Sequence, residues 1–128
     1  MPIHYLIDKE RRLVISTGEG QVTFKQVRTH QDQLLSDPCF DATFSQLIDM
    51  TKAMSLDLSN EEARQIASRN VFSSSSKRAF VATAAHIFGL GRLMEVYQEH
   101  SAKVDVHVFN DMDSALKWLG VGDGFLPG

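Results

Sequence analysis

Apolar and polar residues alternate near the start of the chain in the manner of β-strands. Every second residue over 3–7 is apolar, a polar turn follows at 8–11, and residues 13–17 form an apolar run. This pattern predicts a β-hairpin. Gly18 and Gly20 are expected to end its second strand.

Four later segments have apolar residues at helical spacing, three or four positions apart. The first is expected to stop at Pro38, and the last at Gly120. Ser59 opens a Ser-x-x-Glu capping box, so the second helix has the clearest start. The helices are predicted to begin after Thr23, after Ser59, at Ala84 and after Asp111.

Three further segments read as strands. Residues 45–50 and 79–82 are apolar on both faces, which is typical of strands covered on both sides. Residues 104–108 alternate cleanly, which indicates an edge strand. Strands separated by helices favour parallel pairing with right-handed crossovers. The order therefore predicts an α/β fold with a mixed five-stranded sheet whose first strand is antiparallel.

Composition restricts the class of protein. The 128 residues are 43% hydrophobic and 23% charged, as in a packed globular domain. The net charge is −3 and the basic residues are scattered along the chain, so no basic face is visible. Nucleic acid is therefore not an expected partner. Neither a signal peptide nor an integral membrane segment is visible. The single cysteine, Cys39, favours a reducing compartment, so we expect a cytoplasmic protein with Cys39 buried as a small apolar residue.

The element order, the N-terminal Met1–Tyr5 and the strand segment Leu47–Thr51 together resemble the SpoIIAA-like, or STAS, family. The resemblance covers residue 3 to about residue 120, so we expect one domain over 1–120 and a flexible tail over 121–128. It implies consecutive strand order, four helices mainly on one face of the sheet, and a regulatory module that is not an enzyme.

Members of this family that act on anti-sigma factors are phosphorylated on a Ser or Thr near the helix after the third strand. Thr51 and Ser59 are the corresponding candidate phosphoacceptors here. No Ser-Gly pair follows either residue, so this chain departs from the family motif. The N-cap role of Ser59 is an alternative reason for its position.

Polar residues are expected at the carboxyl ends of the strands and at the helix starts that follow. Ligands of open α/β sheets gather at this edge, where helix N-termini present free N–H groups. The alternative is that each residue only completes a cap or a turn. The candidate ligand-binding residues are Asp49, Thr51, Ser59, Thr83, His86 and Asn110.

Catalytic, metal and cofactor motifs are missing from the sequence. The segment Gly89-Leu90-Gly91-Arg92 lacks the third glycine and the position of a dinucleotide fingerprint, so we expect its glycines to allow close helix packing. The five histidines show no metal-ligand spacing, and no nucleophile elbow is present. We therefore expect no cofactor, no metal and no enzymatic activity.

The sequence leaves two possible functions open. The first is a non-enzymatic regulatory or binding module that contacts a protein partner or forms a homodimer. The second is a small-ligand or lipid-binding protein that uses the strand ends and helix N-termini.

Overall fold

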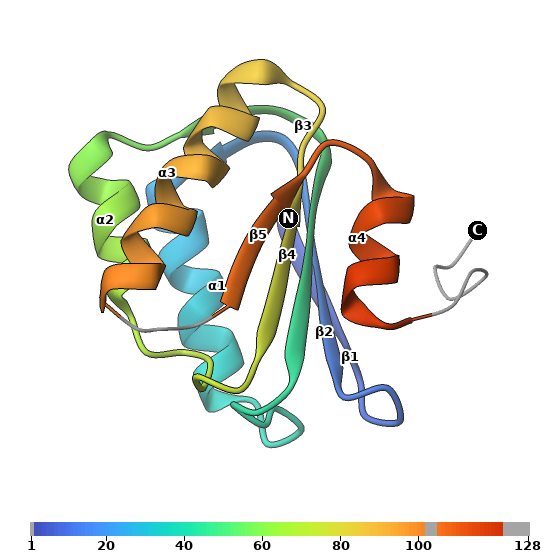
Figure 1. The fold of residues 1–128 in the computed structure, drawn as a ribbon. Helices are drawn as coiled ribbons and strands as arrows, with labels where there is room; N and C mark the ends of the chain where they lie inside the picture. Colours follow the sequence, from blue (N-terminus) through green and yellow to red (C-terminus); the bar gives the residue numbers. More distant parts are fainter. Residues whose placement is uncertain (1, 102–104, 122–128) are drawn as a thin grey trace.

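A computed structural model describes residues 2–101 and 105–121. Within them, strands and helices follow one another in the predicted order (Figure 1). The strands are β1 (Ile3–Asp8), β2 (Leu13–Thr23), β3 (Ser45–Asp57), β4 (Lys77–Val81) and β5 (Asp105–Phe109). The helices are α1 (Phe24–Ser36), α2 (Asn60–Ser68), α3 (Ala85–Ser101) and α4 (Met112–Leu119). Val104 and all of the expected tail except Val121 lie outside the described residues.

The strands form one mixed sheet in the consecutive order β1-β2-β3-β4-β5. β1 pairs antiparallel with β2, and the remaining neighbours pair in parallel. The predicted sheet is thus confirmed, including the place of β5 at an edge. Each parallel pair is joined by one helix, as parallel pairing requires.

Helices α1, α2 and α3 cover one face of the sheet, and α4 lies alone on the other (Figure 1). The alternation of side chains along the strands explains both layers. Leu13 and Leu47 pack with Leu116 of α4, whereas the next residue along β2, Val14, packs with Leu34 of α1. The expectation of helices mainly on one face is confirmed.

Two strands are longer than their apolar runs predict. β2 continues through Gly20 to Thr23, and β3 continues past Met50 to Asp57. The pairing register between them shifts at Gly18 and again after Gly20, whose φ is 62°. The prediction that these glycines end the strand was wrong, because they allow bulges that bend the paired strands without breaking them.

The helix ends follow the sequence signals. Oxygens of Thr23, Ser59 and Asp111 each accept a hydrogen bond from the backbone N–H three residues on, at 3.3, 3.1 and 2.8 Å. The first two caps are complete capping boxes. Gly120 ends α4 with a φ of 79°, a conformation that favours glycine.

The two glycines of α3 differ. A Cβ on Gly91 would lie 2.7 Å from the ring of Phe80 and 2.9 Å from a methyl group of Val108, so this glycine does allow close packing on the sheet. A Cβ on Gly89 would have no atom within 4 Å. The close-packing interpretation therefore holds for Gly91 alone.

Cys39 is exposed, so its expected burial was wrong. It follows Pro38 in the loop after α1, where the Asp37 side chain accepts the backbone N–H of Cys39 at 2.9 Å. This turn directs the loop over the surface and leaves the thiol outside the core.

Candidate functional site

Asp49 and Thr51 lie within β3, not at its end. Both the N–H and the hydroxyl of Thr51 donate to Asp49 Oδ1, at 3.0 and 2.6 Å. Asp49 pairs with Val81, the last residue of β4, so β3 continues beyond the end of β4 from this point. The prediction that the strand ends here was wrong, although the two side chains do meet.

Ser59 lies at the start of α2, far along the extended strand from Asp49. At about 3.3 Å per residue the intervening part of β3 spans on the order of 20 Å. The Ser59 hydroxyl is also engaged as the N-cap of α2. The structure therefore separates Ser59 from Asp49 along β3.

Thr83 and His86 are exposed around the start of α3, and Asn110 is exposed after β5. Among the described residues, none of their side chains makes a hydrogen bond. The backbone N–H of Ala82 donates to Phe109 O at 3.0 Å, which brings Thr83 and Asn110 to the same sheet edge. This edge is polar, but Thr83, His86 and Asn110 line neither of two cavities in the described part of the chain.

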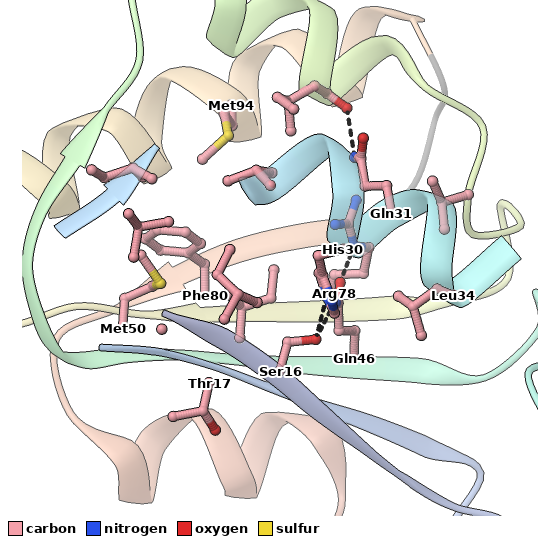
Figure 2. Close-up of a pocket in the computed structure, with 18 of the residues that line it drawn as sticks. Ser16, Thr17, His30, Gln31, Leu34, Gln46, Met50, Arg78, Phe80 and Met94 are labelled. Atoms are coloured by element: carbon pink, nitrogen blue, oxygen red, sulfur yellow. Dashed lines mark hydrogen bonds between the residues drawn. The ribbon is translucent and has the colours of Figure 1, made fainter. Parts of the chain in front are cut away.

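A cavity of about 80 Å³ lies between the sheet and helices α1–α3 (Figure 2). Ile48 keeps accessible surface in the middle of the covered central strand because it faces this space. A cavity of this size has room for several water molecules or a small organic group. Most of its lining is aliphatic or aromatic and includes Val27, Leu34, Ile66, Phe80 and Met94.

A chain of polar side chains crosses the sheet side of the cavity (Figure 2). Arg78 Nε donates to Gln46 Oε1 at 2.9 Å. Gln46 Nε2 then donates to Ser16 Oγ at 2.9 Å, and Ser16 Oγ lies 2.9 Å from Nε2 of His30 on α1. Because Ser16 already accepts from Gln46, its hydroxyl hydrogen is available for His30. The four side chains thus form one hydrogen-bonded chain from the guanidinium of Arg78 to the imidazole of His30.

His30 ends the chain without a complete set of partners. The residue is 8% exposed, and its Nδ1 is buried with no hydrogen-bond partner in the described residues. Desolvation, followed by the positive charge of Arg78, lowers the pKa of His30 from 6.5 to about 4. His30 is therefore neutral at neutral pH.

Arg78 supplies the positive charge of the cavity. Its guanidinium carbon lies 4.9 Å from the ring centroid of Phe72, an arrangement that allows a cation–π contact. Burial lowers the pKa of Arg78 to about 10, so the group stays protonated at neutral pH. Among the described side chains, no carboxylate forms an ion pair with it.

Polar contacts join α1 and α2 beside the cavity. The buried Gln31 donates to Ile66 O at 3.3 Å and accepts from Arg69 at 3.2 Å. Arg69 also pairs with Asp32 at 2.8 Å. These contacts hold the two helices together at a place where polar groups replace apolar packing.

Sequence reasoning missed the polar chain, although a signal for it exists. Gln46 is a polar residue inside the predicted buried strand 45–50, whereas Arg78, which pairs with it, lies just before the predicted strand 79–82. A polar residue at such a position needs a partner or a function. Ser16 and His30 carry no such signal, because their meeting depends on how α1 packs on β2.

Among the described residues, no group of three or more His, Cys, Asp or Glu side chains is arranged to hold a metal ion. No helix in that part of the chain is both long and apolar enough to cross a membrane.

Comparison with solved structures finds similarity to the crystal structure of an uncharacterized protein of the DUF3478 family, with a SpoIIAA-like fold, from Shewanella loihica PV-4. The match covers 91% of each chain, with a TM-score of 0.58 and 16% sequence identity. No protein family model matches the chain, and no curated protein matches it in sequence. The likeness is one of fold, and the chain accordingly has the SpoIIAA-like α/β fold that its resemblance implied.

Proposed function

We propose that this protein is a non-enzymatic, STAS-like binding module that holds a small, largely apolar molecule between its sheet and helices α1–α3. The observation that supports this is the cavity with a polar chain on one side. Empty space and incompletely paired internal polar groups both destabilise a folded domain. Both are expected of a site whose partners come from a ligand.

Filling the cavity tests this proposal. Ile48→Phe adds volume to a residue that lines the cavity, whereas Leu6→Phe introduces the same side chain at a residue that is 58% exposed. Butan-1-ol and butanoate are the probes, with binding followed by chemical shifts of backbone amides and by thermal unfolding. A ligand at one hundred times its Kd adds about 2.7 kcal/mol to the free energy of unfolding.

Wild type and Leu6→Phe are expected to bind at least one probe, with shifts confined to residues around the cavity. Ile48→Phe is expected to stay folded and to lose binding. If the wild type binds neither probe, or if Ile48→Phe binds as well as the wild type, the cavity is not a ligand site.

A second candidate function is a regulatory module that acts through protein contact, as a homodimer or with another protein. It is favoured by Leu6, an exposed apolar residue on the edge strand β1. Its pairing with Ile15 places it on the face that carries α4. Sedimentation velocity tests the homodimer: Leu6→Lys should turn dimers into monomers, and a wild type that is monomeric throughout would count against it.

The remaining expectations belong to the same proposal. The polar edge with Asp49, Thr83 and Asn110 is a second candidate region for a polar ligand or a lipid headgroup, and Thr51 and Ser59 are candidate phosphoacceptors. A cytoplasmic location is proposed from the single cysteine. Mass measurement of the protein after incubation with cognate kinases would show whether Thr51 or Ser59 is modified.

A further inference from the structure

Arg78 lies on the face of the sheet that helices α1–α3 cover, and no anion pairs with it among the described residues. It lines the cavity, and its one hydrogen bond among the described residues goes to the neutral Gln46. By contrast Arg11, Arg64 and Arg69, nearer the surface, each pair with a carboxylate. A guanidinium has five N–H donors, and removing it from water without a counter-ion is unfavourable. Arg78 is partly buried, so this cavity holds a positive charge that no carboxylate of the described residues pairs with.

The charge of the lining indicates a singly charged anion. Arg78 is the one Lys or Arg side chain that lines this cavity in the described part of the protein. The polar residues beside it, Ser16, Gln46 and Gln31, are neutral. A phosphate monoester carries a charge of about −1.5 to −2 at neutral pH and would exceed the single positive charge. A carboxylate matches that charge and fits the planar fork of a guanidinium.

The rest of the lining indicates a short apolar body on that anion. Val27, Leu34 and Ile48 present aliphatic carbon to the space, and Phe80 presents a ring. The thioethers of Met50 and Met94 also line the cavity, and methionine adapts to irregular shapes. The volume of about 80 Å³ is roughly half of the 150 Å³ at which an apolar cavity holds benzene. A small body is therefore favoured over a long acyl chain.

Building on the proposed function, we infer that the ligand is a monocarboxylic acid with a short apolar body, and that its carboxylate binds Arg78. The carboxylate supplies the missing counter-ion at the end of the polar chain. The body fills the space among α1, α2 and α3.

Two matched ligand pairs test the inference without altering the protein. Butanoate and butan-1-ol share a straight aliphatic body, and 2-methylpropanoate and 2-methylpropan-1-ol share a branched one. Affinities from amide chemical-shift titrations at neutral pH are expected to favour the acid at least tenfold in whichever pair fits the cavity. Equal affinity of acid and alcohol would overturn the carboxylate assignment while leaving the proposed function standing. Failure of all four probes to bind would overturn both.

Variants of Arg78 assign the preference to one side chain. Arg78→Met is expected to lose at least tenfold in affinity for the acid and to keep the wild-type affinity for the alcohol. Arg78→Lys keeps the charge but not the fork, so its acid affinity should fall between the two. Arg92→Met removes an exposed cation of α3 and should change neither affinity. If folded Arg78→Met binds the acid as well as the wild type, the assignment to Arg78 is wrong.

Discussion

Acidification should destabilise this protein through His30, because the folded state holds that ring neutral. The imidazole is buried against Ser16 and Tyr5, and desolvation and Arg78 lower its pKa to about 4. In the unfolded chain the same ring takes up a proton near pH 6.5. Between these two values the unfolded state binds more protons, so the free energy of unfolding must fall as the pH falls.

The size of the effect follows from the two pKa values. Each pKa unit corresponds to about 1.4 kcal/mol, so complete passage through the window removes about 3 kcal/mol. Lowering the pH from about 8 to about 5 removes about 2 kcal/mol. This contribution is fully present above pH 6.5 and is exhausted below about pH 4. It is a large part of the stability of a typical small domain.

Urea unfolding of the wild type and of His30→Gln across this pH range measures the effect. His30→Gln removes the titrating ring, so its stability should fall less on acidification by about 2 kcal/mol, whatever its stability at high pH. His86→Gln, at an exposed position, is the control and should follow the wild type. If wild type and His30→Gln lose the same free energy between these pH values, the burial of a neutral His30 is refuted.

Three further changes test the packing, capping and polar contacts of the fold. Gly89→Ala should stabilise by up to about 1 kcal/mol through helix propensity, whereas Gly91→Ala should destabilise by about 1 to 2 kcal/mol because its methyl group would meet a core ring; thermal unfolding that moves both variants in the same direction would contradict this. Ser59→Ala should cost about 1 kcal/mol in urea unfolding and Ser59→Asp much less, and equal losses would contradict the capping role. Tyr5→Phe removes the 2.7 Å hydrogen bond to Asp37, which is the main cause of the lowered pKa of that carboxyl. The loss of stability should be largest near neutral pH and should fade as acid protonates Asp37, and a loss independent of pH would speak against this contact.

The arrangement of elements could be predicted because each has a local cause. Alternation predicted β1, the capping box at Ser59 predicted α2, and Gly120 predicted the end of α4. The length of β3 could not be predicted, because its last residues are held by pairing with a bulged β2 and not by an apolar run of their own. Local pattern cannot show that register.

The candidate site was predictable only in part. The expectation that polar residues gather at the carboxyl ends of the strands located a polar edge, and Asp49 and Thr51 do meet there. The polar chain in the cavity joins residues that are far apart in sequence, and each of them alone has an ordinary explanation. Only the packing of α1 on the sheet brings His30 to Ser16, so this part of the site depends on tertiary structure.

The ends of β2 and β3 extend beyond the neighbouring strands and line one end of the cavity. Gly20–Thr23 pairs with Ala53–Asp57, past the residues of β2 that pair with β1 and the residues of β3 that pair with β4. Val22 and Leu56 in this two-stranded ribbon line the cavity. A ribbon of two strands is only marginally stable by itself, so contact with the helices must hold it in place. Hydrogen bonds between several strands therefore hold the part of the cavity lined by the central sheet, whereas packing against the helices holds the part lined by the ribbon.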